Sequence, residues 1–349
     1  MVERRNDHCL CDHSRRRALK AVAALMVMGG AGRSPAATDS VRISIPGPLL
    51  MPFFPVELIS RLGIDRQLDT QLAIRYHPTG VLALEDMLAG NAEFAGVGFP
   101  VLPKFLEQGR SVVAVARLSS GAPPYAIIVR ADLVDEIRSI GDLRGRTLGV
   151  PVGSVTTKTY LQMVAELWVS SYGVRPQQLR WAPITQTFDG VYGAMAGQTV
   201  DAVFCEEPYS ASLVRQGLGV TLASLSDPRN PVSVVGRDHL RAVIVTTPDF
   251  VGKRPERVQQ MMRMLRRALQ WTATATPQAL VDRLEIADPA QRADIIDALT
   301  RLPPPYSGDG RFSETEIAAT RDFIRAVGIE LPHQRDVKTL IDDRWVNRD

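Results

Sequence analysis

The segment between residues 146 and 171 constrains the fold of this chain most strongly. A short apolar strand, 146–150, is followed by a loop of glycine, serine and threonine and then by a helix that we expect to begin at Thr156. Such a turn directs unpaired backbone N–H groups and the positive end of the helix toward whatever lies above the loop. Hydroxyl donors on Ser154, Thr156 and Thr157 complete a predicted seat for a carboxylate, sulfonate or phosphate group. The alternative is an ordinary capped helix whose Ser and Thr side chains serve only their own backbone.

Strands and helices alternate along the chain, and this order predicts mostly parallel, doubly wound sheets. The pattern restarts near residue 140, which predicts a second α/β unit. We therefore expect an α/β fold with two lobes, each a mixed, mostly parallel sheet flanked by helices. The strands are expected at 41–45, 71–76, 92–97, 112–118, 125–129, 148–150, 179–182, 200–205, 220–223 and 241–246.

The order of these elements also predicts where the chain divides. The first lobe is expected at 37–122, the second at 123–237, and a return to the first lobe, with a helical C-terminal region, at 238–349. Crossings near 121–124 and 232–240 would place a cleft between the lobes. Strand ends that face such a cleft are where α/β proteins bind ligands.

Residues 1–36 have the three parts of a secretory signal. A basic start at 14–20 precedes an apolar run at 21–31, and small residues follow at 34–37. The order of Ser, two Arg, Leu and Lys in the basic start resembles the twin-arginine signal. The apolar run is too short to span a bilayer, which needs about 20 apolar residues. We expect cleavage after Ala36 or Ala37 and a mature protein in the periplasm.

Cysteine usage and charge exclude several classes of protein. Cys9 and Cys11 precede the apolar run and are lost on cleavage, which leaves only Cys205, so we expect no intrachain disulfide and no cysteine-based metal cluster. Seven of the 41 Lys and Arg residues and three of the 38 Asp and Glu residues lie in 1–36, so the mature chain is nearly neutral. Such a balance gives no reason to expect nucleic acid or an anionic membrane as a partner.

Three blocks of the sequence together resemble one family. Residues 142–150 and the Gly-Ser pair that follows match the block "DLkGkkvgv…gS" of type 2 periplasmic substrate-binding proteins. Residues 193–203, followed by Glu-Pro-Tyr at 207–209, resemble the block "al.aG.vDa…eP" of the nitrate/sulfonate/taurine branch. Residues 83–94 are similar to the equivalent block of the first lobe, and the resemblance covers 40–345.

The resemblance implies a clamshell of the periplasmic-binding-protein type 2 class, whose two lobes close on ligand by a hinge. It implies an extracytoplasmic receptor for a small, anionic organic solute such as a sulfonate, taurine or a carboxylate. The expected partners are this solute and the ABC permease and ATPase complex at the inner membrane. A monomer with no cofactor, no metal and no chemistry of its own is implied as well.

The binding residues are expected on loops that face the cleft. Gly98, Gly121 and Gly153 end strands and let the backbone approach a ligand closely. Glu206 or Glu207, at a strand end beside Tyr209, either faces the cleft or serves as a first-turn carboxylate of the following helix. If Glu207 faces the cleft, the ligand should carry a donor or cation as well as an anion. The expected set is Gly98, Phe99, Ser120, Gly121, Gly153, Ser154, Thr156, Thr157, Phe188, Glu207 and Tyr209. Four aromatic residues either line the cleft, which would favour an organic ligand over nitrate, or pack in the core: Tyr125, Trp181, Phe188 and Tyr209.

Two other functions stay open on the sequence. An enzyme on this fold, such as a desulfinase, would need a cysteine nucleophile with a histidine partner, and the candidates are Cys205 with His77 or His239. The Cys/His-rich motifs expected of thiamine-precursor enzymes are absent from the sequence, as are the common hydrolase, metalloprotease and P-loop motifs. A ligand sensor without a transport role would use the same clamshell, and a neighbouring permease gene would separate the two.

Overall fold

The computed structural model of the protein describes residues 40–119, 124–227, 238–302, 306–331 and 336–346. The expected signal segment, 1–36, lies outside these ranges, and so do the expected binding residues Ser120 and Gly121. Within the described ranges, no helix has both the length and the apolar character that crossing a membrane requires.

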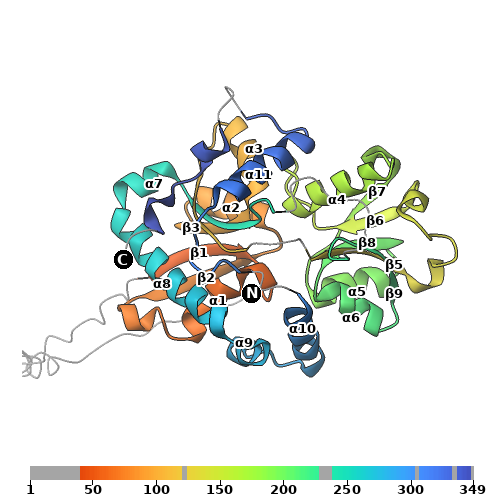
Figure 1. Ribbon diagram of the computed structural model, residues 1–349, viewed down its shortest axis with the longest axis horizontal. Helices are drawn as coiled ribbons and strands as arrows, with labels where there is room; N and C mark the ends of the chain where they lie inside the picture. Colours follow the sequence, from red (N-terminus) through yellow and green to blue (C-terminus); the bar gives the residue numbers. More distant parts are fainter. Residues whose placement is uncertain (1–39, 120–123, 228–237, 303–305, 332–335, 347–349) are drawn as a thin grey trace, which may run out of the picture. The chain divides into compact units, whose positions relative to one another are not determined.

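The first sheet has five strands in the order β2-β1-β3-β10-β4. Figure 1 labels three of them, β2, β1 and β3. β1 pairs in parallel with β2 and β3, whereas β10 pairs antiparallel with β3 and β4, so β10 alone runs against the other four. This sheet is mostly parallel because helices connect successive strands. Its strands are β1 (Ser40–Pro46), β2 (Gln71–His77), β3 (Phe94–Gly98), β4 (Val113–Arg117) and β10 (Ala242–Thr246); the helices between them are α1 (Phe54–Arg61), α2 (Gly80–Leu88) and α3 (Leu102–Glu107).

The second sheet repeats this design in the order β7-β6-β8-β5-β9. β6 is parallel to β7 and β8, and β5 is the strand that runs against its neighbours β8 and β9. β5 and β10 are the first strands after the two passages of the chain from one sheet to the other. The elements are β5 (Tyr125–Arg130), β6 (Thr147–Val150), α4 (Tyr160–Ser171), β7 (Arg180–Pro183), α5 (Phe188–Ala196), β8 (Ala202–Glu206), α6 (Tyr209–Arg215) and β9 (Gly219–Ser224).

The chain ends in a largely helical region, as expected. Its helices are α7 (Pro248–Lys253), α8 (Pro255–Thr274), α9 (Pro277–Leu284), α10 (Pro289–Arg301) and α11 (Glu314–Ala326). The expected last helix near 337–342 is instead a short 3-10 turn, η8 (Val337–Leu340). α8 presents a continuous buried face that includes Met261 and Leu265, and it packs against α1.

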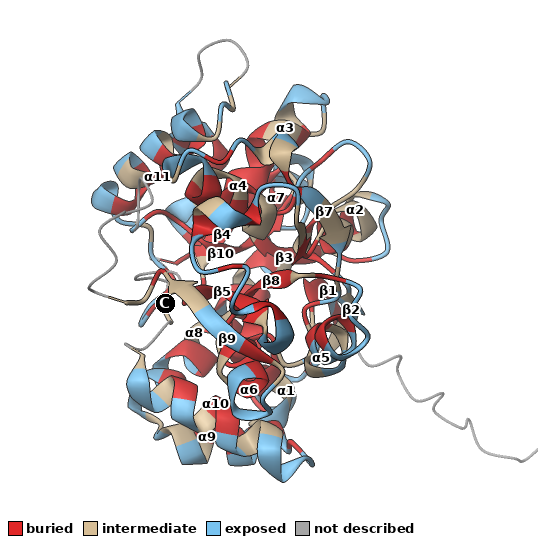
Figure 2. Ribbon diagram, turned by 90° about the vertical axis from the view of Figure 1, so that its right-hand side faces the viewer, coloured by how far each residue is buried: buried red, intermediate tan, exposed pale blue. Residues whose placement is uncertain are grey.

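The core lies on both faces of the two sheets. Every residue of β8 and of β10 is buried (Figure 2), which is typical of strands covered by helices on both sides. In the second sheet, Phe204 packs edge-on against Trp168 of α4, with the ring centroids 6.1 Å apart. The strands therefore form rigid supports, and their ends can hold a site in place.

Candidate functional site

A cavity of about 70 Å³ lies where strands of both sheets end. Pro46 and Gly98, at the ends of β1 and β3, line it from the first sheet. Tyr125, at the start of β5, and Glu206, at the end of β8, line it from the second. Strand ends are the usual ligand site of open α/β sheets, and this volume admits several water molecules or a small solute.

Two helices begin at the cavity wall: α2, which flanks the first sheet, and α4, which flanks the second. Residues 79–81 at the start of α2 and 159–161 at the start of α4 line the cavity. Thr79 and Thr159 are N-caps: each hydroxyl oxygen accepts a hydrogen bond from the backbone N–H three residues later, at 3.3 Å and 3.0 Å. The first N–H groups of a helix have no acceptor within the helix, and the helix dipole makes this end positive. Two such ends at one cavity favour an anionic group there.

The polar side chains of the cavity include one buried cation and one buried acid. Arg241 is 3% exposed and Glu206 is 2% exposed. Burial raises the pKa of Glu206 to about 7, although Arg241 and a hydrogen bond from Tyr125 oppose the shift. Burial also raises the pKa of Tyr125 and Tyr160, so both hydroxyls are neutral hydrogen-bonding groups.

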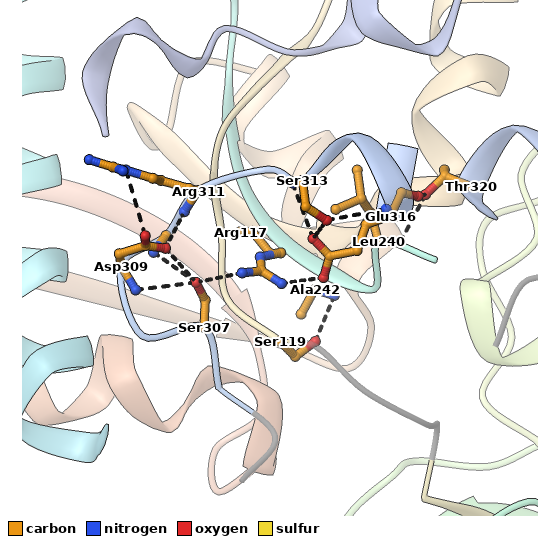
Figure 3. Close-up of polar contacts among 11 residues, drawn as sticks. Arg117, Ser119, Leu240, Ala242, Ser307, Asp309, Arg311, Ser313, Glu316 and Thr320 are labelled. Atoms are coloured by element: carbon orange, nitrogen blue, oxygen red, sulfur yellow. Dashed lines mark hydrogen bonds and ion pairs between the residues drawn. The ribbon is translucent and has the colours of Figure 1, made fainter. Parts of the chain in front are cut away.

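The backbone on both sides of Arg241 is held by side-chain hydroxyl groups (Figure 3). The N–H of Leu240 donates to Thr320 Oγ1 at 2.8 Å, and the N–H of Ala242 donates to Ser119 Oγ at 3.0 Å. The carbonyl of Arg241 accepts from a backbone N–H at the end of β3, at 2.7 Å. These bonds hold the Arg241 backbone at the cavity without using its guanidinium group.

A second set of contacts ties the C-terminal region to β4, as Figure 3 also shows. Arg117 contacts the carboxylate of Glu316 and donates to Ser307 Oγ at 3.2 Å. Glu316 and Ser313 form a capping box at the start of α11. Thr320, which holds Leu240, lies one turn later on the same helix, so this ion pair supports the segment before β10 that carries Arg241.

Tyr160, the first residue of α4, makes a close contact with the end of β3. A Cβ atom added to Gly98 would lie 2.5 Å from the Cβ of Tyr160, far closer than such atoms approach in proteins. The Tyr160 hydroxyl is 2.8 Å from Nε2 of His239, whose ring stacks on Phe323 at a centroid distance of 4.1 Å. Position 98 therefore requires glycine, because the start of α4, which flanks the second sheet, closely approaches its backbone.

The predicted loop 153–157 has a different local structure from the one expected. The helix begins at Tyr160 rather than Thr156, because Ser154 and Thr157 pair their backbone groups at 3.0 Å and 3.4 Å in a tight turn. A Cβ on Gly153 would lie 1.9 Å from the Thr157 carbonyl oxygen, so this turn requires glycine. The hydroxyls of Thr156 and Thr157 accept from the Gln108 amide, at 3.3 Å and 3.2 Å. The cavity meets α4 at 159–161, a few residues beyond the predicted seat.

The other predicted residues divide between the cavity and the core. Gly98 lines the cavity, whereas Phe99 is fully buried beside it. Phe188 packs edge-on against Tyr209 with the ring centroids 5.0 Å apart. The Tyr209 hydroxyl donates to the Leu49 carbonyl at 3.2 Å. Both rings thus pack outside the cavity lining.

Glu206, and not its neighbour in the sequence, faces the cavity. Glu207 precedes the N-cap of α6, accepts from the N–H of Ala211 at 3.2 Å and lies 3.7 Å from Arg301, so its carboxylate serves the start of that helix. Sequence reasoning did not find Gln186 or Arg241 as site residues. A signal for Arg241 is present, because a charge directly before an apolar strand is expensive to bury without a role.

Comparisons with known proteins identify a family and a fold for the chain. The family model described as "NMT1/THI5 like" matches residues 69–279. No curated protein matches the chain. Among solved structures, it is similar to a protein from Bordetella bronchiseptica RB50, with a TM-score of 0.76 and 18% identity over 88% of this chain and 95% of that one.

Two further similar structures are named for their ligands. The alkanesulfonate-binding protein SsuA from Xanthomonas axonopodis pv. citri, bound to MOPS, has a TM-score of 0.66 and 18% identity over 87% of this chain and 98% of that one. The periplasmic nitrate-binding protein NrtA from Synechocystis PCC 6803 has a TM-score of 0.64 and 14% identity over 87% and 85%. These similarities confirm the expected periplasmic-binding-protein fold.

Proposed function

The chain belongs to the NMT1/THI5-like family, and we propose that it is an extracytoplasmic receptor that binds a small anionic organic solute and delivers it to an ABC importer. The observation that carries the proposal is the cavity walled by two helix N-termini and Arg241. The similar structures named as alkanesulfonate-binding and nitrate-binding proteins support an acidic ligand.

The acidic head of the solute binds between the starts of α2 and α4. There the backbone N–H groups at 80–81 and 160–161 and the Arg241 guanidinium supply donors from both sheets. A guanidinium presents its donors as a planar fork that suits two oxygens of one anion. Each hydrogen bond to a charged group contributes about 1.5–3 kcal/mol. The donors come from both sheets. A bound anion therefore favours the arrangement of the two sheets in which these donors point at the same position.

The predicted loop 153–157 stays a second proposal for contacts with the same head. Ser154 Oγ is buried and has no hydrogen-bond partner within the described residues. Replacing Ser154 with Ala tests the proposal: affinity about tenfold lower would support a contact with the solute. Unchanged affinity would mean that the acidic head of the solute is bound by the starts of α2 and α4 and by Arg241, without Ser154.

The structure argues against the cysteine nucleophile that an enzyme on this fold would need. Cys205 is fully buried, and burial raises the pKa of its thiol well above the ordinary value. A nucleophilic cysteine needs the opposite environment, one that lowers the pKa and admits the substrate. His77 contacts Asp86 at 3.1 Å, and His239 contacts Tyr160. We therefore propose a receptor without catalysis.

A thermal-shift screen of the mature protein with small sulfonates, carboxylates and nitrate tests this function, because a ligand that binds only the folded state raises the melting temperature. Calorimetric titration of a positive solute then compares wild type with Arg241→Gln. We expect at least a tenfold loss of affinity, since one charge-assisted contact is removed. Arg263→Gln, on the exposed face of α8, is the matched control. The proposal fails if no anion binds, or if both variants bind as wild type does.

A further inference from the structure

The wall of the cavity formed by the second sheet is acidic. Glu206 lies at the end of β8 with its Oε1 atom buried, and this atom has no hydrogen-bond partner within the described part of the chain. Gln186, which is 4% exposed, lines the same cavity, and its Nε2 atom is likewise buried without a partner among the described residues. Buried polar atoms in folded proteins are nearly always hydrogen-bonded, so this pair points to a ligand that supplies the missing partners.

The chemistry of the two groups defines what the ligand must present. An ionised carboxylate only accepts hydrogen bonds, and an amide nitrogen only donates them. A solute that carried only negative charge would place that charge near the Glu206 carboxylate, which opposes binding. A solute with an N–H group near its acidic head would instead donate to Glu206 Oε1.

The groups around Glu206 show that its own charge decides this selection. Arg241 is the cation that acts on it, and Tyr125 donates a hydrogen bond to it. Among the described residues, four further buried groups interact with it electrostatically and stay neutral near pH 7, because burial raises the pKa of each: Tyr160, Cys205, Tyr209 and Tyr306. The carboxylate of Glu207, the next residue, instead accepts from Ala211 at the start of α6. The cavity thus holds a cation, Arg241, and a carboxylate, Glu206. This pair matches a ligand that carries one negatively charged and one positively charged group.

We propose that the solute carries an N–H donor, an ammonium or amine group, beside its acidic head, and that Glu206 is the residue that selects it. The inference rests on the proposed function, which supplies the acidic head. The ligand class is therefore a compact amino-substituted sulfonate or carboxylate.

The ionisation of Glu206 gives this selection a pH signature. The pKa of the buried carboxyl is about 7, and an ammonium group prefers the ionised form. Affinity for an amino-sulfonate therefore rises about tenfold between pH 6 and pH 8, because the ionised fraction of such an acid rises by about that factor. Affinity for a sulfonate without an amino group falls over the same range, because the ionised carboxylate repels it.

The test is calorimetric titration of 2-aminoethanesulfonate and of ethanesulfonate into the mature wild type, Glu206→Gln and Glu330→Gln. The two probes differ only in the amino group, and Glu330 is an exposed control. We expect wild type and Glu330→Gln to bind the amino probe at least tenfold more tightly than ethanesulfonate. In Glu206→Gln both this preference and the pH dependence disappear, while ethanesulfonate binds at least as well as to wild type.

Each other outcome overturns the inference in a recognisable way. Equal binding of the two probes by wild type, or a preference that survives in Glu206→Gln, refutes selection by Glu206 and leaves the proposed anion receptor standing. If neither probe binds wild type at any pH, the proposed function for small sulfonates fails and the inference falls with it. If Glu206→Gln does not fold, the opposite pH trends of the two probes in wild type decide, and parallel trends refute the inference.

Discussion

The hydroxyl of Tyr160 lies 2.8 Å from Nε2 of His239. This contact joins the first turn of α4, on the second sheet, to the segment that returns the chain to the first sheet and carries Arg241. Both residues are buried, and 79 positions separate them in the sequence. The start of α4 and the cation of the cavity are therefore held in one network.

Replacing Tyr160 with Phe should lower the free energy of unfolding by about 1–3 kcal/mol, because the substitution leaves a buried histidine nitrogen without this partner. Urea denaturation followed by circular dichroism measures the change. Tyr192→Phe is the matched control, since Tyr192 is 45% exposed and surface substitutions usually change stability by no more than about 0.5 kcal/mol. Equal stability of the two variants would contradict a structural role for the contact.

Gly98→Ala should weaken both stability and solute binding. Its new Cβ would meet the Cβ of Tyr160 at 2.5 Å, so the start of α4 must move away from β3. Overpacking of this kind costs about 1–3 kcal/mol, and the displaced helix start would lose part of its proposed contact with the anionic solute. Urea denaturation and calorimetry test both effects. In Gly193→Ala on α5, nothing lies within 4 Å of the added atom, and we expect unchanged or slightly higher stability. If Gly98→Ala has the stability and solute affinity of wild type, the start of α4 does not pack tightly against the end of β3.

Glu57 should make the protein less stable as the pH rises. Burial raises the pKa of this carboxyl from 4.5 to about 7, although Leu49 N–H donates to it at 3.0 Å. Between these two values the folded state holds more protons at this site than the unfolded state, so stability falls as the pH increases through the window. The loss is complete above about pH 7 and amounts to about 3 kcal/mol at most.

Glu57→Gln should remove this pH dependence, because its amide does not ionise. We expect the variant to be more stable than wild type at pH 8 and similar to wild type at pH 4.5, as measured by urea denaturation across the range. Glu330→Gln, at an exposed position, serves as the control. A variant whose stability follows the wild-type profile at every pH would show that Glu57 ionises as freely in the folded state as in the unfolded state.

Export should depend on the arginine pair at 15 and 16. Arg15→Lys with Arg16→Lys should leave the precursor in the cytoplasm, because the pair is the central element of the twin-arginine signal. Mass spectrometry of the periplasmic fraction should find a mature wild-type protein that begins near Ala37 or Thr38. Arg4→Lys with Arg5→Lys preserves charge in the same way outside the motif and should be exported normally. Unchanged export of the first variant would exclude this route.

The sequence determined the kind and order of the elements. Alternation of apolar strands with helices that end at glycine predicted both sheets, and the predicted strand at 200–205 differs from β8 by only a few residues. Local rules decide such features, because a strand end or an N-cap depends on neighbours within one turn. Gly98 was found by the same reasoning, since glycine at a strand end marks a close approach of backbone.

Only the tertiary structure decided which side chains share the cavity. Thr79, Thr159 and Arg241 are far apart in the chain, and each has an ordinary local reading as a cap or a charge beside a strand. The choice between Glu206 and Glu207 depends on which way the last residue of β8 faces once the sheet is packed, because a shift of one residue reverses the face. Packing of two sheets against one cavity sets that direction, and no local pattern contains it.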